Sequence, residues 1–259
     1  MIQQLSGRTL VAILAHPDDE SLACGGTLAR AAAEGVRVVL ICLTRGEGGS
    51  SWDPALLKDS DLGAVRAREL NEAAATLGLA DVVLLSYPDG ELPWADAGAI
   101  EADIRQHVER IHADAVITFG ADGLYWHPDH IAVHDRTVAA LEALSGWRPG
   151  VYCVTMPPGT MRTIVEEAGQ RSGETRGPWG LAPDAFGAYA QAPDLSIDVS
   201  AFAVRKLQAL RCHRTQIGPD NPLAQVPLDR AGALLGVEHF HCSRAGEGVP
   251  PLLERLAMP

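Results

Sequence analysis

Short apolar runs alternate with helix-length segments through the first 155 residues, and this alternation constrains the fold most strongly. Strands are predicted at residues 9–15, 36–43, 81–85, 113–119 and 151–155, and helices at residues 22–34, 62–77, 100–111 and 128–144. Runs that are apolar throughout are typical of strands buried on both faces, and helices between them form right-handed crossovers. The pattern predicts an α/β fold with a three-layer parallel sheet, helices on both faces, and a ligand site at the carboxyl ends of the strands.

Two stretches depart from the alternation. Residues 46–60 are rich in Gly, Ser and Asp, and residues 156–195 are rich in Gly and Pro with interspersed aromatic side chains. Loops this long in a compact domain usually act as lids or as oligomer contacts. We therefore expect a single domain over residues 1–259, with a long variable segment at about 156–196. A strand and a helix are predicted after it, at residues 196–199 and 201–212.

The charge balance and the cysteines narrow the class of protein. Lys and Arg number 21 against 33 Asp and Glu, so the formal net charge is −12. General binders of nucleic acid or of anionic membranes need a basic surface, which this composition disfavours. Five scattered cysteines without a Cys-x-x-Cys pair fit a reducing compartment. Because no apolar stretch approaches the roughly 20 residues of a membrane span and no signal-peptide pattern is present, we expect a cytoplasmic protein.

An acidic turn that carries a histidine follows the first predicted strand: His16-Pro17-Asp18-Asp19-Glu20. It lacks the Gly-x-Gly-x-x-Gly pattern of dinucleotide sites, and acidic groups attract a cation rather than a pyrophosphate. Residues three apart share one face of a helical turn, so His16 and Asp19 can hold one edge of a divalent metal. Asp18 is offset but adjacent, where it can take a proton from metal-bound water. Helix capping by these acidic residues is the alternative.

A second histidine-rich turn follows the fourth predicted strand and contains Tyr125, His127, Pro128 and His130. Pro128 suits the first position of a helix, which leaves His127 at the cap and places His130 within the first turn. His134 lies one turn later on the same face as His130, so either imidazole is a candidate ligand. A hydrogen-bonded histidine that binds no metal is the alternative for His134.

Taken together, the two turns predict a metal site with two histidines and one carboxylate, formed by His16, Asp19 and His130. Three protein ligands with open positions are typical of a catalytic metal. Zinc lowers the pKa of bound water to roughly 7, and the same ligand types also suit iron(II). With Asp18 as a base and either His127 or Tyr125 as an oxyanion stabiliser, the set contains the groups needed to hydrolyse an amide.

In these two turns the chain resembles the LmbE/PIG-L family of zinc-dependent N-acetylglucosaminyl deacetylases. The resemblance rests on Ala-His-Pro-Asp-Asp-Glu at residues 15–20 and His-Pro-Asp-His at residues 127–130. Further matching stretches are residues 44–49 (TRGEGG), 66–70 (RAREL), 87–90 (YPDG) and 206–216 (KLQALRCHRTQ). The similarity keeps the family's order over about residues 8–217. It implies a Rossmann-like α/β domain and the hydrolytic removal of an acyl group from an amino sugar.

The resemblance also implies roles for individual residues. The family's motif gives the same three metal ligands and makes Asp18 the general base. His127 would stabilise the charged tetrahedral intermediate or protonate the departing amine, and Tyr125 resembles the tyrosine that assists the oxyanion in mycothiol-pathway members. Arg66 and Asp89 fall where such members hold the sugar hydroxyls. A surface salt bridge for Arg66 and a turn-forming role for Asp89 are the alternatives.

Three positions outside this set carry further expectations. Trp126 stands where several relatives have a small residue, so we expect it to reshape the pocket. His213 matches a family position that reaches an active site, with a structural histidine at a helix end as the alternative. His239 and His241 alternate around Phe240, which favours an edge strand over a metal site.

The sequence thus favours a zinc-dependent N-deacetylase, with Fe²⁺ as the alternative ion. The expected substrate is a small N-acetylglucosamine conjugate or an acylated natural-product intermediate, and no nucleic acid or membrane is expected as a partner. One rival is an amidase that releases a larger group from an amino-sugar thiol conjugate. A second rival is a non-catalytic binding protein that has kept the metal. Association into a homo-oligomer is left open.

Overall fold

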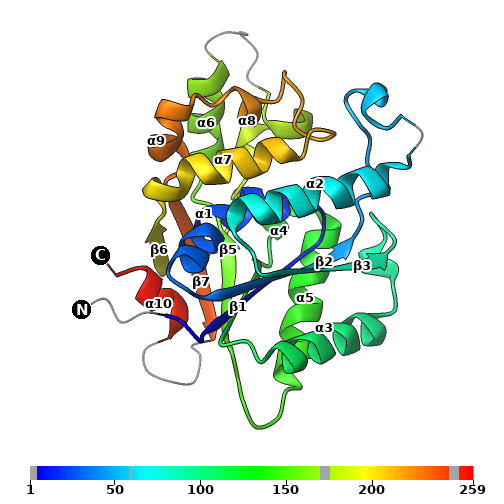
Figure 1. Ribbon diagram of the computed structural model, residues 1–259, viewed down its shortest axis with the longest axis vertical. Coiled ribbons are helices and arrows are strands. Elements are labelled where there is room, and N and C mark those ends of the chain that lie inside the picture. Colours follow the sequence, from blue (N-terminus) through cyan, green and yellow to red (C-terminus); the bar gives the residue numbers. More distant parts are fainter. Residues whose placement is uncertain (1–4, 59, 170–175, 245–250, 259) are drawn as a thin grey trace.

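The computed structural model describes residues 5–58, 60–169, 176–244 and 251–258. These residues form an α/β fold in which a mostly parallel sheet lies between helices (Figure 1). The strands are β1 (Thr9–Leu14), β2 (Arg37–Thr44), β3 (Asp81–Tyr87), β4 (Ala115–Phe119), β5 (Gly150–Thr155), β6 (Leu195–Asp198) and β7 (Val237–Arg244). The α-helices are α1 (Asp19–Ala33), α2 (Leu62–Leu77), α3 (Ala97–Ile111), α4 (Gly123–Trp126), α5 (Pro128–Glu142), α6 (Thr160–Gly169), α7 (Ala203–Cys212), α8 (Pro222–Gln225), α9 (Ala231–Leu235) and α10 (Leu252–Leu256). Short 3-10 helices are η1 (Pro54–Leu56), η2 (Leu92–Trp94), η3 (Pro178–Gly180), η4 (Pro183–Ala185), η5 (Ser200–Phe202) and η6 (Leu228–Arg230).

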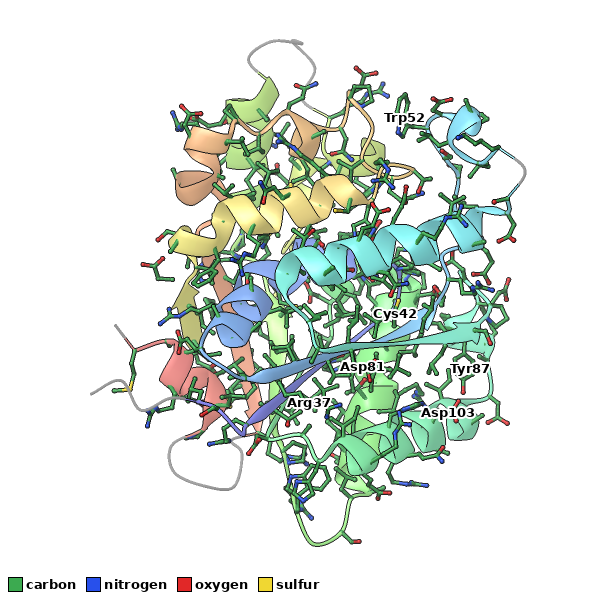
Figure 2. All side chains as sticks on the ribbon, in the orientation of Figure 1. Arg37, Cys42, Trp52, Asp81, Tyr87 and Asp103 are labelled. Carbon is green, nitrogen blue, oxygen red and sulfur yellow. The ribbon has the colours of Figure 1, made fainter. Side chains whose placement is uncertain are left out.

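The described strands are ordered β3-β2-β1-β4-β5-β7-β6 in the sheet. The strands from β3 to β5 are parallel to one another, as predicted, whereas β7 runs antiparallel to both β5 and β6. Figure 2 marks β2 by Arg37 and Cys42, and the two ends of β3 by Asp81 and Tyr87. The Tyr87 hydroxyl donates to Asp103 Oδ2 of α3 at 2.6 Å. This bond ties the edge strand to the helix beside it.

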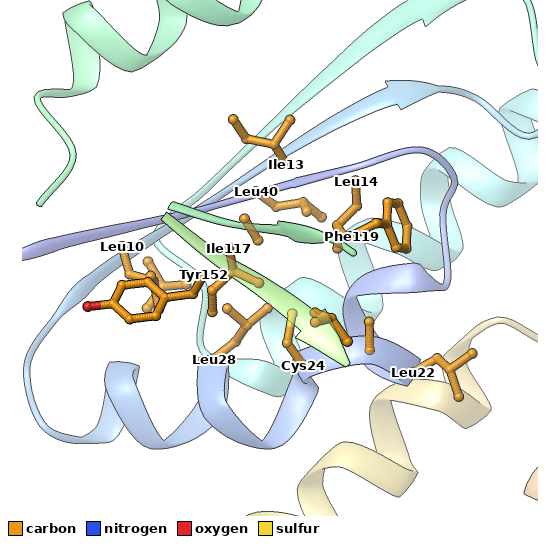
Figure 3. Packing of buried hydrophobic residues seen from close by; sticks show 14 of the residues in the cluster. Leu10, Ile13, Leu14, Leu22, Cys24, Leu28, Leu40, Ile117, Phe119 and Tyr152 are labelled. Carbon is orange, nitrogen blue, oxygen red and sulfur yellow. The ribbon is translucent and has the colours of Figure 1, made fainter. Parts of the chain in front are cut away.

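Helices cover both faces of the sheet, which confirms the predicted three-layer arrangement. The helices α1, α2 and α7 pack together on one face, and α3 and α5 pack together on the other (Figure 1). Every residue of β1, β4 and β5 is buried, as expected for strands covered on both faces. Figure 3 shows Ile117 and Tyr152 of the sheet packed near Leu28 and Cys24 of α1. A close-packed core of this kind fixes the strand ends from which the site loops leave.

Local sequence signals set the ends of the predicted helices. Asp61 caps α2 by accepting a hydrogen bond from the Ala64 N–H at 2.8 Å, and Gly78 ends this helix in the left-handed conformation. The helix α5 begins at Pro128, with His127 at its cap, as the sequence predicts. The other strands and helices predicted in the first 155 residues are also confirmed, with ends shifted by a few residues.

The segment predicted as a loop at 156–195 contains regular structure. Its described part forms α6, η3 and η4, while residues 170–175 lie outside the described residues, as does Asp59 in the predicted loop 46–60. The helix α6 buries Met161, Ile164 and Val165, which have helical spacing. The prediction was wrong here because the flanking Gly and Pro residues masked this short amphipathic stretch.

At His239–His241 the predicted strand is confirmed as part of β7, but its predicted position at an edge of the sheet is wrong. The strand β7 lies between β5 and β6. The alternation is as predicted: Phe240 is fully buried, whereas the two imidazoles lie on the other face and contact polar partners. His239 Nδ1 lies 2.8 Å from Ser196 Oγ, and His241 Nδ1 lies 3.0 Å from Asp194 Oδ2. The two histidines therefore pair with different neighbours.

The start of α1 differs from the prediction as well. The helix begins at Asp19, three positions earlier than predicted, and its backbone is broken at Cys24, where φ is −148°. All five cysteines of the chain are free. Among the described residues, no helix combines the length and the apolarity that crossing a membrane requires.

Candidate active site

Four segments meet at one edge of the sheet. They follow the neighbouring strands β3, β2, β1 and β4 and carry Asp89, Gly46, His16 and, in the first turn of α5, His130. Arg66 of α2 reaches into the same place, where its Nη1 donates to the Gly46 carbonyl at 2.9 Å. Residues that are far apart in the sequence thus meet at the carboxyl ends of parallel strands, where α/β sheets bind ligands.

The predicted ligand side chains converge at this edge. His130 Nε2 lies 3.2 Å from His16 Nδ1 and 3.2 Å from Asp19 Oδ1. His16 Nδ1 lies 3.4 Å from Asp19 Oδ2. All three side chains are buried. Ligand atoms that share a tetrahedral zinc ion, each about 2.0–2.1 Å from it, are roughly 3.3 Å apart. The donor types and their spacing therefore fit a divalent metal.

The outer atoms of the same side chains are anchored by the protein. His130 Nδ1 lies 3.1 Å from the Gly123 carbonyl, to which it donates, so Nε2 is left as the acceptor. His16 Nε2 lies 3.0 Å from Asp129 Oδ2, which leaves Nδ1 on the inner side. Asp19 Oδ2 accepts the His16 backbone N–H at 2.7 Å. Metal-binding histidines characteristically donate their other N–H to a carboxylate or a carbonyl, and this arrangement has that form.

Two other groups of ligand atoms lie within 4.8 Å of one another, namely His16/His127/His130 and His16/Asp89/Asp129. In the second group, His16 Nε2 lies 3.0 Å from both Asp89 Oδ1 and Asp129 Oδ2. The Asp129 oxygens, however, already accept from the N–H groups of Gly90 at 2.8 Å and Leu92 at 3.2 Å. A carboxylate held in this way is well suited to orient His16.

The electrostatics of this cluster favour positive charge. Burial lowers the pKa of His16, but Asp129, Asp19 and Asp89 together raise it well above its usual range. Burial raises the pKa of Asp19, but His130 and His16 bring it well below its usual range. Surroundings that stabilise a charged imidazole also stabilise a metal cation.

Asp18 borders the cluster in a strained backbone conformation. Its φ is +125°, which is rare for a residue other than glycine and recurs at functional sites. The alternative of helix capping is wrong for this side chain, because it makes no capping hydrogen bond to α1. Asp18 Oδ2 instead accepts from Arg66 Nη2 at 3.2 Å. Burial raises the pKa of Asp18 to about 6, against the opposing effect of Arg66.

Arg66 is held in place by backbone carbonyls. Besides its bond to Gly46, it donates from Nη2 to the Pro17 carbonyl at 2.6 Å. Gly46 has a φ of +68°, and a Cβ at this position would lie 2.3 Å from Arg66 Nη1. Only glycine allows this approach. Arg66 is buried, so the alternative of a surface salt bridge is wrong.

His127 presents one ring nitrogen to the protein and leaves the other available. Its Nδ1 accepts from the Asp129 N–H at 3.2 Å, so the neutral ring carries its proton on Nε2. Burial, followed by the nearby His130 and His16, lowers the pKa of His127 to about 4. The ring is therefore a neutral hydrogen-bond donor beside the cluster.

Tyr125 packs between the cluster and the variable segment. Its ring lies edge-on to His130 and packs against Phe186, with ring centroids 5.2 and 4.8 Å apart. Burial raises the pKa of Tyr125 well above its usual value, and the carboxylates of Asp19 and Asp18 add to this effect. Its hydroxyl therefore stays protonated and able to donate.

A cavity of about 270 Å³ opens beside the cluster. Its lining residues are His16, Asp18, Gly49, Arg66, Asp89, Tyr125, His127, Trp179, Leu181 and Gln216. The expectation that Trp126 reshapes this pocket is wrong. Trp126 is not among the described residues that line it; 52% of its surface is exposed, and its ring packs edge-on against Tyr189 with centroids 5.1 Å apart.

The other two predicted histidines lie outside the converging trio. His134 Nδ1 lies 2.8 Å from the Phe119 carbonyl, which fits the alternative of a hydrogen-bonded histidine. His213 is fully buried, and its Nε2 lies 2.8 Å from Glu20 Oε1. Glu20 Oε2 in turn accepts from the Asp18 N–H at 3.0 Å. His213 therefore reaches the Asp18 turn through Glu20.

Sequence reasoning missed several residues of this site. Asp129 was overlooked although it stands between two histidines of the quoted motif, a position that signals a carboxylate partner. Glu20 was interpreted only as a helix-start residue. Trp179, Leu181 and Gln216 also line the cavity. Trp179 and Gln216 lie in stretches that the sequence singled out, but neither was named as a site residue, because only the folded chain brings their loops to this edge.

Comparison with known proteins agrees with this geometry. The model of the family described as PIG-L, GlcNAc-PI de-N-acetylase, matches residues 11–141. A 1D-myo-inositol 2-acetamido-2-deoxy-alpha-D-glucopyranoside deacetylase from Acidothermus cellulolyticus is 32% identical over 93% of this chain and 92% of its own length.

Two solved structures share the fold. The conserved protein TT1542 from Thermus thermophilus is 29% identical, with a TM-score of 0.60 over 93% of this chain and 97% of its own. The N,N'-diacetylchitobiose deacetylase from Pyrococcus horikoshii is 23% identical, with a TM-score of 0.61 over 90% of this chain and 83% of its own. The match to the family model and the likeness to the Acidothermus deacetylase establish that this chain belongs to the PIG-L family, as a metal-dependent N-deacetylase.

Proposed function

We propose that this protein removes the N-acetyl group from an N-acetylglucosamine conjugate, yielding acetate and a free amine. The observation that carries the proposal is the convergence of His16 Nδ1, His130 Nε2 and the Asp19 carboxylate beside Asp18 and a cavity. The Acidothermus relative is named for a glucosamine-type sugar joined to inositol, and the Pyrococcus protein for a two-sugar substrate. In the reaction, water adds to the amide carbon, the C–N bond breaks, and the departing amine takes up a proton.

We assign His16, Asp19 and His130 as the ligands of a divalent ion, Zn²⁺ with Fe²⁺ as the alternative. The 3.2–3.4 Å spacing of their inner atoms supports this set, as do their anchored outer atoms. In the rival set with Asp89 and Asp129, the Asp129 oxygens are already engaged by backbone donors. When bound, such an ion polarises the amide carbonyl and lowers the pKa of water to roughly 7.

Asp18 is assigned as the general base. Its pKa of about 6 suits proton transfer near neutral pH, where a base must be ionised yet able to accept a proton. Arg66, itself fixed by the Gly46 and Pro17 carbonyls, holds Asp18 Oδ2 at 3.2 Å. The strained φ of Asp18 is compatible with such a fixed position.

His127 and Tyr125 are assigned to the oxyanion of the tetrahedral intermediate. Both line the cavity, and both are neutral donors in these surroundings. Donors fixed before the reaction stabilise developing negative charge without reorganising, which is the basis of oxyanion stabilisation. Protonation of the departing amine by His127 is the alternative assignment.

Arg66 and Asp89 are assigned to the sugar hydroxyls. Both line the cavity, and Asp89 is fixed because its Oδ2 accepts from the Gly48 N–H at 2.9 Å. Charged groups of this kind form strong hydrogen bonds with hydroxyls. Trp179 and Leu181 from the variable segment line the same cavity, which supports a role for that segment in substrate choice. We further propose that residues 1–259 act as one domain in the cytoplasm.

The test is acetate release from a panel of purified substrates: N-acetylglucosamine, its inositol glycoside and N,N'-diacetylchitobiose. We expect hydrolysis of at least one glycoside, its loss after treatment with a strong chelator, and recovery on addition of Zn²⁺. Elemental analysis of the untreated protein identifies the ion. Hydrolysis that persists after the metal has been fully removed contradicts the assigned mechanism.

Two other outcomes identify the rivals. Cleavage of bulky N-acyl derivatives in preference to N-acetyl derivatives favours the amidase for larger conjugates. Metal binding without hydrolysis of any member of the panel favours the non-catalytic binding protein. Each outcome contradicts the proposed N-acetyl substrate.

A further inference from the structure

A second cavity, of about 430 Å³, adjoins the first one. The two cavities share Trp179 and Gln216 in their linings. The second is bordered by Trp52 from the loop after β2, by Arg176, Gly177, Trp179 and Gly180 of the variable segment, and by the turns that follow α7. The described residues that border it include none of those assigned above to the metal, the base or the oxyanion. It is therefore an extension of the site away from the reacting amide.

Trp52 is held in place by hydrogen bonds rather than by burial in the core. Its indole N–H donates to the Arg214 carbonyl at 2.6 Å, and its backbone N–H donates to the Thr215 carbonyl at 3.3 Å. A Cβ on Gly218 would lie 2.7 Å from the indole ring, so the glycine allows this loop to pack directly against it. The side chain nevertheless stays 52% exposed, and Figure 2 shows it in the loop beside η1. Trp52 does not stand alone, because Trp179 borders the same cavity and presents a second indole to it.

The loop that holds Trp52 is itself anchored to α2. Glu69 accepts from the Thr215 N–H at 2.9 Å and from the Thr215 hydroxyl at 2.7 Å. Gln216 Nε2 donates to the Ser50 carbonyl at 3.1 Å, which fixes its Oε1 as an acceptor at the junction of the two cavities. Trp179 completes this side with a left-handed φ of +54°, a strained conformation for a tryptophan. The aromatic walls are thus preorganised.

The chemistry of this lining suits a polyhydroxylated ring. Two indoles offer apolar faces for the C–H groups of such a ring, and Gln216, Asp220 and Asn221 offer groups that bond hydroxyls. Among the described residues that line the cavity, Pro219 and Pro222 supply the aliphatic surface. A ring with hydroxyls uses both the apolar faces and the polar groups of this lining, whereas an alkyl chain uses only the apolar faces.

We infer that this cavity binds the ring attached to the amino sugar, a second sugar or a cyclitol, with Trp52 as the stacking residue that selects two-ring over one-ring substrates. The inference rests on the proposed deacetylase function, since it names the substrate class of that same site. The adjoining position explains how one end of the substrate meets Asp18 while the other lies against Trp52.

The experiment compares Trp52→Ala with the natural protein on the inositol glycoside of N-acetylglucosamine and on N-acetylglucosamine itself. We expect kcat/KM for the glycoside to fall about tenfold and that for the monosaccharide to change less than about twofold. Trp52→Phe should restore part of the loss because it keeps an aromatic face. Trp94→Ala is the matched control, since Trp94 is 73% exposed and borders neither cavity.

A binding measurement separates failure of this inference from failure of the deacetylase proposal. Calorimetry with the deacetylated glycoside and with glucosamine should give tighter binding of the two-ring compound, and Trp52→Ala should remove the difference. This readout does not require turnover. Equal affinities in the natural protein overturn the inference, as does an equal loss of kcat/KM on both substrates. A loss confined to N-octanoylglucosamine also overturns it, because the cavity would then hold the acyl group.

Discussion

Two clusters of buried charge contact α1, and they differ in how their charges are matched. The first is the site cluster at the start of the helix, formed by His16, Asp19, His130 and Asp129. The second, the Lys206 cluster, lies at the break near Cys24. There Glu238 accepts from the Gly26 N–H at 2.8 Å, from the Thr27 N–H at 2.7 Å and from Lys206 Nζ at 2.6 Å.

The Lys206 cluster is complete within the chain. The break at Cys24 frees backbone N–H groups, which Glu238 accepts as a cap would, and Lys206 balances its charge. In the site cluster the inner acceptors of His16 and His130 face each other at 3.2 Å, and a cavity adjoins them. Buried charge alone therefore does not identify a site. The difference that supports one is the adjoining cavity, together with imidazole and carboxylate atoms that lie 3.2–3.4 Å apart.

The largest effect is expected from Asp18→Asn, which tests whether the site cluster serves chemistry rather than stability. Asparagine keeps the size of the side chain and tolerates a positive φ. We expect kcat/KM to fall by roughly 10²–10⁴-fold because the base is lost. Metal content should stay unchanged, and Tm should fall less than in Lys206→Met because the Gly46 and Pro17 carbonyls still hold Arg66. Exposed Asp229→Asn provides the control. Full activity in Asp18→Asn excludes Asp18 as the base.

Lys206→Met tests whether the Lys206 cluster serves stability rather than chemistry. The substitution leaves the buried carboxylate of Glu238 without its cation, which costs about 3–5 kcal/mol of unfolding free energy. We expect that loss in chemical denaturation, with kcat/KM per folded molecule retained. Arg205→Met is the control on the same helix, because Arg205 is exposed. If Lys206→Met instead lost activity and kept its stability, the Lys206 cluster would not be a purely structural counterpart of the site cluster.

The smallest effect is expected from Asp129→Asn, which tests whether Asp129 orients His16 or binds the metal itself. An amide cannot accept at both oxygen positions, so one donor among His16, Gly90 and Leu92 loses its partner. We expect Zn²⁺ affinity, measured by chelator competition, to fall about 10–100-fold. Exposed Asp135→Asn on the same helix should leave it unchanged. Complete loss of metal binding would instead indicate that Asp129 is itself a ligand.

Local patterns were sufficient for the parts of the fold that depend on near neighbours in the chain. Asp61 caps the start of α2 and the left-handed Gly78 ends it, as is typical of Asp and Gly at these positions, and Pro128 is the first residue of α5. The alternation of strands and helices gave the parallel part of the sheet. The helix α6 was not predicted, and neither were the antiparallel direction and the inner position of β7, because a strand's partners and a short helix's burial depend on distant contacts.

The sequence by itself determined which residue types stand at the carboxyl ends of the strands, and hence that imidazoles and carboxylates meet there. Only the tertiary structure decided which atom of each side chain faces which partner. It turned His16 Nε2 toward Asp129 and Nδ1 toward His130, set Asp18 against Arg66, and brought Trp52 and Trp179 to one cavity. The physical reason is that side-chain orientation at a buried site depends on hydrogen bonds between segments 48 to 114 positions apart, and spacing along the chain carries no information about those bonds.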